Sequence, residues 1–451
     1  MLATLCLLAG AGAAGPALAS GLPSLQLGFG DGLYTASDSA VRATWLERSA
    51  ALGARVVRMY AGWPAATRPA DPADPADPAY AFTSLDAAIR DAAAHHLAPL
   101  LVFSGAPSWA EGPSRPASAT PGTWLPDPAA VGAYGRALAT RYDGHFPDPL
   151  HPGLALPRVK LFQLWNEPNL SAYLTPQWQR RAGRWIPVAA DQYRLMLNAF
   201  YAGVNATVAG DTVVAAGTAP YGDFGHGQRM MPVVFWKNLL ASPVSFDVMA
   251  HQPYSIGSPP TKALDAGDVA VADLGKLTSV LRAAERRGTA LPRGEHHQLW
   301  ITETGYDTRP PNPGGVPVAT DARWLEQSLF LFWAQGVDLV TWYLIRDQPP
   351  GGPPDSSSQT GVYYYAGNPK PAATAYRFPL VGHRVAGGKV RAWLRAPQAG
   401  TLVLQARSSG RWATVRRTVV SAAQILDLPV PGRPQELRAT VAGISSLVWT
   451  L

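Results

Sequence analysis

Short apolar runs alternate with longer stretches of helical periodicity along most of this sequence. The stretches between the runs, such as SLDAAIRDAAAHH and DQYRLMLNAFYAGV, carry alanine and leucine at helical spacing. Strands that alternate with helices form a parallel sheet, and eight such units match a closed barrel better than an open doubly wound sheet. We therefore predict an α/β protein, a (β/α)8 barrel whose strands are residues 25–29, 55–60, 99–104, 159–165, 212–217, 246–251, 298–303 and 338–344.

From about residue 380 the periodicity changes to two. Segments such as KVRAWLRA and GTLVLQARSS alternate apolar and polar residues, and Gly, Pro and Ser separate them. We predict that residues 20–379 form the barrel and residues 380–451 a C-terminal all-β domain, a small sandwich that packs against the barrel. Its arginines interleave with Trp393 and Trp412. We interpret them as solvent-facing positions of amphipathic strands rather than as a nucleic-acid surface: Arg391, Arg395, Arg407, Arg411, Arg416 and Arg417.

The first 19 residues combine an apolar stretch with the small-residue site Ala17-Leu18-Ala19, as a secretory signal peptide does, although a charged start is missing. Cys6, the only cysteine, lies in this segment, so we expect neither disulfides nor thiolate chemistry in the mature chain. No other stretch is long and apolar enough to span a membrane. We therefore expect a secreted or cell-envelope protein without stable membrane insertion.

The composition of the chain excludes disorder, and its charge favours acidic partners without selecting one of them. An apolar fraction of 47% with 15% charged residues excludes a disordered chain. The formal net charge is +7 and the isoelectric point is near 9.5. Such a balance favours acidic partners, which include nucleic acid, anionic lipid and acidic polysaccharide.

Two glutamates follow two of the predicted strands. Glu167 lies in LFQLWNEPNL after the fourth strand, and Glu303 lies in QLWITETGYDT at the end of the seventh. The carboxyl ends of barrel strands carry the active sites of (β/α)8 enzymes. With strands about 4.8 Å apart and tilted about 36°, strands four and seven face each other across roughly 14 Å. Two inward side chains of about 4 Å each then leave roughly 5 to 6 Å between the carboxyl groups.

This estimated separation predicts a particular chemistry. It matches the about 5 to 5.5 Å between the carboxyl groups of a retaining glycosidase and is shorter than the roughly 6.5 to 9.5 Å of an inverting one. Cleavage of a glycosidic bond needs a protonated carboxyl group and an ionised one, and their environments must separate the two. Arg58, in the second strand, is a candidate partner for the ionised group.

A metal or cofactor is not part of this prediction. His95-His96 and His296-His297 are adjacent pairs, and neighbouring side chains point in different directions on a helix or a strand. They have no accompanying HExxH or cysteine spacing, and no Walker loop or GxGxxG motif occurs. We therefore predict neither a metal site nor a cofactor.

The motifs WNEPN, AHQPY and TETG after strands four, six and seven resemble those of glycoside hydrolase clan A, the retaining barrel glycosidases. The segment FSGAPSWA and the C-terminal β domain are most similar to family 39, which includes β-xylosidases, iduronidases and exopolysaccharide hydrolases. The resemblance implies that Glu167 is the acid/base and Glu303 the nucleophile. It also implies that Asn166 binds the sugar hydroxyl beside the anomeric carbon and that Tyr254 and Arg58 contact the nucleophile.

Aromatic residues near strand ends are candidates to stack on sugar faces. They are Trp342 in strand eight, Trp109 after strand three and Trp63 after strand two, although a tryptophan is more often part of the core. His251 at strand six is a candidate to bond a sugar hydroxyl.

The prediction is a retaining O-glycosyl hydrolase acting on an oligo- or polysaccharide by double displacement. Two alternatives remain open, a catalytically inactive carbohydrate-binding barrel and a transglycosylase on the same scaffold. The basic balance of the chain favours an anionic exopolysaccharide as substrate. Sequence patterns do not select the sugar, the linkage, endo or exo action, or the oligomeric state.

Overall fold

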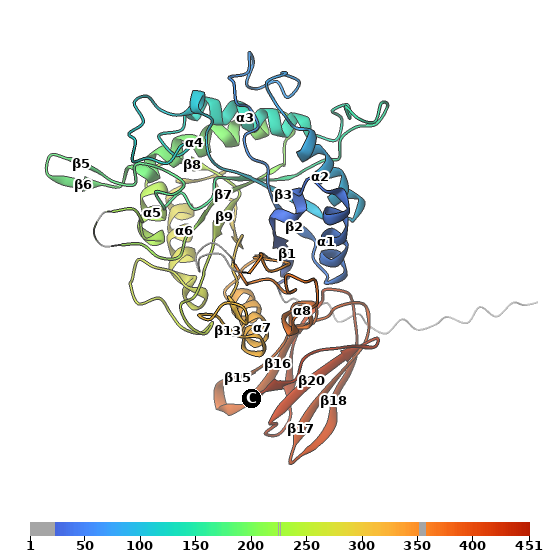
Figure 1. Ribbon diagram of the computed structural model, residues 1–451. Helices are drawn as coiled ribbons and strands as arrows, with labels where there is room; N and C mark the ends of the chain where they lie inside the picture. Colours follow the sequence, from blue (N-terminus) through green and yellow to red (C-terminus); the bar gives the residue numbers. More distant parts are fainter. Residues whose placement is uncertain (1–22, 224, 226, 351–357) are drawn as a thin grey trace, which may run out of the picture.

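The computed structural model describes residues 23–223, 225, 227–350 and 358–451, and its centre is a closed parallel barrel (Figure 1). The predicted segment 1–19 lies outside the described residues. The strands close in the order β1-β14-β11-β9-β7-β4-β3-β2, so the predicted (β/α)8 barrel is confirmed. All eight predicted runs supply one barrel strand each: β1 (Gln26–Gly30), β2 (Val56–Tyr60), β3 (Ala98–Phe103), β4 (Leu161–Leu164), β7 (Thr212–Thr218), β9 (Val248–His251), β11 (Gln298–Ile301) and β14 (Leu339–Trp342).

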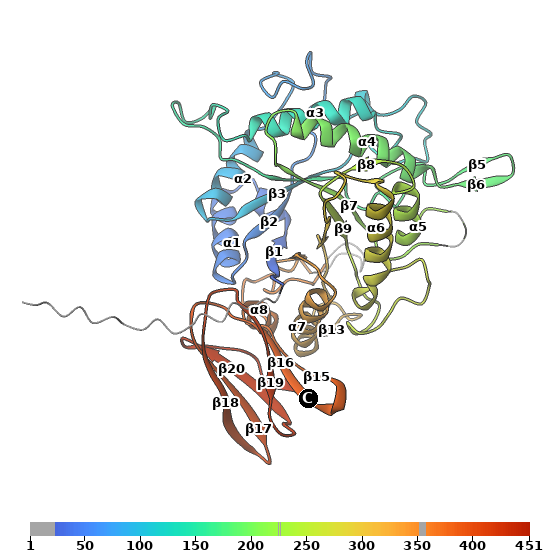
Figure 2. The same cartoon turned by 180° about the vertical axis from the view of Figure 1, so that it is seen from behind.

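Helices surround this barrel in both views (Figures 1 and 2). Local sequence sets several of their ends: the Asp38 side chain caps the first helix, and Asp127 caps the third, which starts with a proline. Gly288, with φ of 71°, ends the sixth in the left-handed region. The helices are α1 (Ser39–Ala51), α2 (Thr83–Ala94), α3 (Pro128–Arg141), α4 (Val188–Asn205), α5 (Pro232–Leu239), α6 (Gly275–Arg287), α7 (Val318–Ala334) and α8 (Pro371–Arg377).

Side chains along the barrel strands alternate between its interior and its helix-covered outside. The interior holds a separate apolar cluster, and intervening strand residues such as Val57, Phe162 and Met249 belong to the larger core around it. On β2 this alternation places Arg58 at the interior position two residues after Val56. The interior cluster consists of Val56, Leu100, Leu161, Val214, Val248, Ala250, Trp300 and Leu339.

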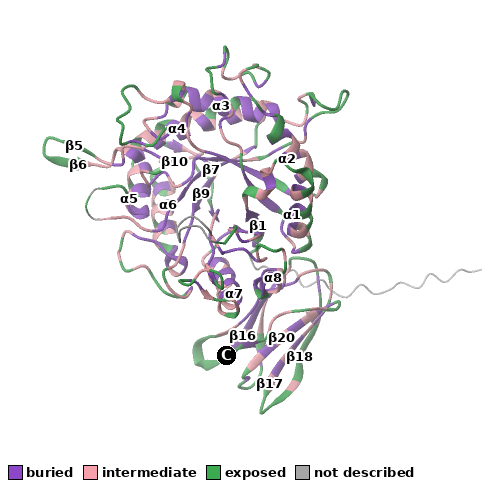
Figure 3. Cartoon of the chain, viewed as in Figure 1, coloured by how far each residue is buried: buried purple, intermediate pink, exposed green. Residues whose placement is uncertain are grey.

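The C-terminal region forms two antiparallel sheets beside α7 and α8 (Figure 1). One sheet contains β15 (Leu380–Arg384), β16 (Val390–Arg395) and β19 (Ile425–Val430). The other contains β17 (Gly400–Ser408), β18 (Arg411–Val420), β20 (Glu436–Val441), β21 (Ile444–Ser445) and β22 (Trp449–Thr450). Buried residues follow the inner faces of both sheets (Figure 3).

One arginine predicted to face solvent in this region is instead buried, next to a buried tryptophan of the same strand. Trp393 is fully buried, with its ring centroid 5.7 Å from that of Phe330 and 5.9 Å from that of Trp333, both on α7. Arg395 is also buried, beside Tyr376 of α8. The expectation is wrong for Arg395 because the sheet packs on the barrel helices through this strand. Arg411, Arg416 and Arg417 are exposed, as expected.

Several loops contain pairs of short strands. β5 (Gln179–Arg181) and β6 (Arg184–Ile186) form a hairpin in the loop between β4 and α4, and it projects from the molecule in both views (Figures 1 and 2). The other short pairs are β8 (Val244–Ser245) with β10 (Ala290–Leu291), and β12 (Thr308–Arg309) with β13 (Val316–Pro317). Within the described ranges, no helix has the length and apolar character needed to cross a bilayer.

Candidate active site

Glu167 is held three residues beyond β4 by an unusual backbone. Trp165 and Glu167 both have positive φ, 65° and 39°, which side chains other than glycine rarely adopt. The Glu167 amide donates to the Gly217 carbonyl (3.2 Å), and Gly217 is an extra residue where β7 shifts its register against β9. Such strain persists only where surrounding contacts fix it, and it gathers at functional sites.

Arg58 connects the two strands that carry the glutamates. It lies on β2 at an interior position and is almost completely buried. Its Nε donates to Gln163 Oε1 (3.0 Å), Nη2 to Asn166 Oδ1 (2.8 Å) and Nη1 to Glu303 Oε2 (3.0 Å). One guanidinium therefore fixes the end of β4 relative to the residue that follows β11.

Both carboxyl oxygens of Glu303 accept a hydrogen bond. Arg58 occupies Oε2, and the Tyr254 hydroxyl donates to Oε1 (2.8 Å). One of these donors is a cation, so the contacts suit an ionised carboxylate with a fixed orientation. Strands four and seven of the barrel are three positions apart in its closed order, as predicted.

Asn166 has a defined amide orientation. Its Oδ1 accepts from Arg58 and also from Gln252 Nε2 (2.9 Å). Two donors on the oxygen direct the amide nitrogen the other way, and the side chain also interacts with the Tyr173 hydroxyl. Asn166 can therefore present N–H donors to a bound hydroxyl group.

The environment of Glu167 differs from that of Glu303. Burial, together with the negative charge of Glu303, raises the pKa of Glu167 to about 8. The positive charges of Arg58 and Arg229 oppose this rise. At neutral pH the Glu167 carboxyl therefore carries its proton, while Glu303 lies between a cation and a phenol.

Four tyrosines surround the pair of glutamates. Burial raises the pKa of all four, and the next raising cause is the negative charge of Glu303 for Tyr60, Tyr254 and Tyr343 and that of Glu167 for Tyr173. Their phenols remain protonated and can donate hydrogen bonds. Sequence reasoning identified only Tyr254 among them.

The side chains of two predicted substrate contacts, His251 and Trp342, point away from the barrel interior. His251 is fully buried, its Nδ1 is 2.9 Å from Thr218 Oγ1 and its Nε2 is 3.0 Å from the Val269 carbonyl. Burial lowers its pKa to about 4. Trp342 is fully buried, and its Nε1 donates to the Thr360 carbonyl (3.1 Å). Neither side chain has surface left for a sugar, so these two predictions are wrong.

The strand alternation explains both errors. On β9 Ala250 is interior, so the next interior position after it is Gln252 and His251 points to the helices. On β14 Leu339 is interior, so Tyr343 rather than Trp342 occupies the interior register at the strand end. The signal that could have found Gln252 and Tyr343 is therefore the period of two, applied one residue further along each strand.

The remaining tryptophans divide between core and surface. Trp63 is buried and stacks on Tyr134 with ring centroids 4.9 Å apart. It is a core residue, which contradicts its predicted role as a platform. Trp109 is half-buried, and its Nε1 donates to the Ala65 carbonyl (3.0 Å). Trp109 thus keeps some exposed ring surface, and no contact with either glutamate is recorded in the described part of the chain.

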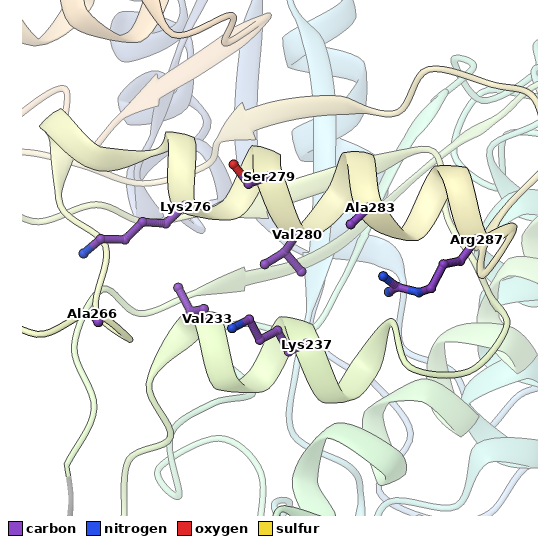
Figure 4. Close-up of a pocket in the computed structure, with 8 residues that line it drawn as sticks. All are labelled: Val233, Lys237, Ala266, Lys276, Ser279, Val280, Ala283 and Arg287. Atoms are coloured by element: carbon purple, nitrogen blue, oxygen red, sulfur yellow. The ribbon is translucent and has the colours of Figure 1, made fainter.

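A separate hollow of about 420 Å³ lies between α5 and α6 on the outside of the barrel (Figure 4). Its lining includes Lys237, Lys276 and Arg287. Lys276 forms an ion pair with Asp273 (2.7 Å), and Arg287 donates to the Leu240 carbonyl. No carboxylate lines this hollow, so it does not offer the chemistry of the glutamate pair. Among the described residues, no group of His, Cys, Asp and Glu side chains is arranged to hold a metal.

The fold and this site together define a class: a (β/α)8 barrel with a carboxyl pair at the ends of its fourth and seventh strands. Solved glycoside hydrolases share this fold. A family 39 enzyme from the gut symbiont Bacteroides cellulosilyticus WH2 has a TM-score of 0.57 and 15% identity, with 90% of this chain and 81% of that chain covered.

A GH39 β-xylosidase from Caulobacter crescentus has a TM-score of 0.50 and 14% identity, covering 92% of this chain and 95% of that chain. A GH5_18 protein from Bifidobacterium longum subsp. infantis has a TM-score of 0.51 and 15% identity, with 79% and 78% covered. At such low identity these similarities establish the fold. No family model and no curated protein matches the sequence.

Proposed function

We propose that this protein is a retaining glycoside hydrolase that cleaves O-glycosidic bonds of an oligo- or polysaccharide. The observation that carries the proposal is the contrast between the two carboxyl groups. Glu303 accepts hydrogen bonds from Arg58 and Tyr254, whereas burial and the charge of Glu303 raise the pKa of Glu167 to about 8. The fold shared with families 39 and 5 supports the same activity.

The proposed reaction has two displacements. In the first, a carboxylate oxygen of Glu303 attacks the anomeric carbon while Glu167 gives its proton to the departing glycosidic oxygen. The bond to the leaving sugar breaks, and an ester between the glycosyl group and Glu303 forms. In the second, Glu167 takes a proton from water, the water oxygen attacks the anomeric carbon, and Glu303 leaves as the carboxylate.

The neighbouring residues have supporting roles in this proposal. Arg58 and Tyr254 orient the Glu303 carboxylate and disperse the charge that returns to it when the ester breaks. The Asn166 amide, oriented by Arg58 and Gln252, donates to the hydroxyl beside the anomeric carbon. The phenols of Tyr60, Tyr173 and Tyr343 offer further donors around the bound sugar.

A panel of aryl glycosides tests the proposal. We expect turnover of at least one of them, its abolition in Glu303→Ala, and rescue by azide with a glycosyl azide of inverted anomeric configuration. In Glu167→Ala, azide should instead give the retained configuration, because it replaces water in the second step. Glu47→Ala, an exposed glutamate on α1, is the control and should keep wild-type rates.

Other outcomes separate the alternatives. Glycan binding without turnover of any glycoside would indicate an inactive carbohydrate-binding barrel and contradict the proposal. Transglycosylation shares the first displacement and differs in the acceptor, so product analysis with an added sugar acceptor distinguishes it from hydrolysis.

We also propose that residues 1–19 direct export of the protein to the cell envelope or the medium. Sequencing the N-terminus of the protein recovered from the producing cell tests this directly. A chain that keeps residues 1–19 in the cytoplasm would contradict it.

A further inference from the structure

The loop between β4 and α4 carries a hairpin that contains three arginines and no acidic residue. β5 and β6 are joined by Ala182 and Gly183, both with positive φ (47° and 79°), as a tight two-residue hairpin turn requires. Arg180, Arg181 and Arg184 are all exposed, and the projecting hairpin is drawn as exposed in Figure 3. The sequence contains no Asp or Glu between Glu167 and Asp191.

Two of these arginines face each other. Arg181 is the direct cross-strand partner of Arg184, and like charges at opposed positions of an antiparallel pair destabilise it. Arg181 Nε donates to the neutral Gln179 side chain (2.8 Å). Beyond the hairpin, Arg194 forms an ion pair with Asp191, but none of the three hairpin arginines has an ion pair within the described ranges. A two-stranded hairpin is only marginally stable, so the repulsion between Arg181 and Arg184 lowers a stability that is already small.

The loop that carries the hairpin also carries Glu167, and residues 227–231, which precede α5, are hydrogen-bonded to it. The Ser171 amide donates to the Gln228 carbonyl (2.8 Å), and Asn169 Nδ2 donates to the Met230 carbonyl (2.9 Å). Between these contacts, Leu170 and Arg229 form an antiparallel bridge. The β4 loop and residues 227–231 therefore form one hydrogen-bonded unit on the Glu167 side of the site.

Arg229 places a further cation on this unit. Its side chain is exposed, and its charge acts on the Glu167 carboxyl. Since Glu167 gives its proton to the leaving group in the proposed reaction, residues on its side lie next to the leaving part of the substrate. Arg229 and the hairpin therefore belong to the same pair of hydrogen-bonded segments as Glu167.

We propose that Arg180, Arg181, Arg184 and Arg229 form a basic arm that binds the leaving-group portion of an acidic polysaccharide. This inference rests on the proposed glycosidase function. Guanidinium groups bind carboxylates with two parallel hydrogen bonds, which suits uronic acid residues. Single exposed ion pairs contribute little, so the arm binds a chain that repeats its charge and not a single acidic sugar.

The test compares two probes with the same sugar chain, one with free carboxylates and one in which methyl esters remove their charge. The full-length protein, with Glu303→Gln to prevent cleavage, is titrated with fluorescently labelled oligogalacturonate and with its fully methyl-esterified form. The arm variant carries Arg180→Gln, Arg181→Gln and Arg184→Gln. The matched control carries Arg411→Gln, Arg416→Gln and Arg417→Gln, which removes the same number of exposed charges from β18. Melting temperatures verify that both variants are folded.

We expect the acidic probe to bind more tightly than the ester, and the arm variant to bind it at least about fivefold more weakly at low ionic strength. The control should bind like the parent, and Arg229→Gln should weaken binding in the same direction as the arm variant. Equal losses in the arm variant and the control would mean that net charge alone acts, and would overturn the proposal. Equal affinity for acid and ester would also overturn it.

Duplex DNA serves as a competing polyanion. Binding of DNA that exceeds that of oligogalacturonate and depends on the same arginines would assign the arm to nucleic acid and overturn the inference. Hydrolysis of neutral aryl glycosides by the wild-type protein is measured separately. Turnover without arm-dependent binding would refute the arm and leave the proposed function standing, whereas arm-dependent binding without turnover would support the arm and refute the hydrolase.

Discussion

At the scale of single residues, the site depends on two carboxyl groups placed in opposite environments. Glu303 accepts from a buried cation and a phenol, whereas Glu167 is buried beside the negative charge of Glu303. The residues that surround each glutamate set its environment. The first two predictions test these neighbours.

The first concerns the pH dependence of the reaction. In the proposed reaction Glu167 is the acid, so kcat/KM should fall as pH rises through about 8, where its carboxyl loses the proton. The positive charge of Arg229 lowers this pKa, so Arg229→Gln should move the alkaline limb upward by about half a pH unit at low ionic strength. The pH profile on an aryl glycoside measures it, with Arg411→Gln as control. A downward shift in Arg229→Gln would contradict the assignment.

The second concerns the Tyr254 hydroxyl. Tyr254→Phe removes one of the two hydrogen bonds to Glu303, and a bond to a charged group contributes about 1.5–3 kcal/mol. We expect kcat to fall about 10- to 100-fold with little change in melting temperature. Tyr306→Phe, which removes a buried hydroxyl group bonded to Ser328, should leave kcat near the wild-type value. Equal losses of kcat in the two variants would refute the role of Tyr254.

At the scale of secondary structure elements, the strands bring the site together and could be predicted from sequence. Each of the eight apolar runs forms a barrel strand, so Arg58, Asn166, Glu167 and Glu303 could be assigned to one end of the barrel. The errors at His251 and Trp342 arose because an all-apolar strand does not show which of its two faces is interior. Tyr173 and Arg229 come from long loops, whose path depends on contacts between the loops that local sequence does not encode.

The bulge at Gly217 has no room for a side chain. A Cβ there would lie 2.7 Å from Gln163 Nε2 and 3.1 Å from Thr302 Oγ1, and φ is +87°. Gly217→Ala should therefore destabilise the protein by about 2–4 kcal/mol and displace Gln163, which Arg58 contacts. Gly210→Ala is the control, since Gly210 has φ of +91° but no atom within 4 Å of its Cβ.

Gly210→Ala should cost about 1 kcal/mol, the strain of a positive φ alone. Chemical denaturation measures both free energies of unfolding, and kcat/KM on an aryl glycoside reports the displacement of Gln163. Equal destabilisation in the two variants, with activity retained in Gly217→Ala, would show that the bulge has no role in positioning the site.

At the scale of the whole molecule, the C-terminal sheets and the barrel share one core. A single cluster of buried residues extends from Leu25 through the barrel helices to Trp449. Phe330 and Trp333 on α7 contact Trp393 on β16, and Glu326 accepts a hydrogen bond from the Leu380 amide. The sequence predicted a β domain packed on the barrel. It could not show that β16 makes this contact, because the alternating pattern around Trp393 and Arg395 is typical of an amphipathic strand with one solvent-exposed face.

We therefore expect Trp393→Ala to destabilise the whole chain by about 3–5 kcal/mol and to lower one cooperative melting transition. Trp412→Ala, on the outer strand β18, should have a smaller effect on the same transition. Calorimetry measures both. Two separate transitions, of which Trp393→Ala shifts only one, would show that the β domain folds independently of the barrel.

In the proposed reaction Glu303 forms a covalent bond to the sugar while Glu167 supplies the proton. The most direct measurement incubates the protein with an activated 2-deoxy-2-fluoro glycoside of the sugar selected by the aryl glycoside panel, followed by peptide mass spectrometry. We predict one glycosyl adduct per chain, on the peptide that contains Glu303, and none in Glu303→Gln. An adduct on another residue, or an unchanged adduct in Glu303→Gln, would contradict the account.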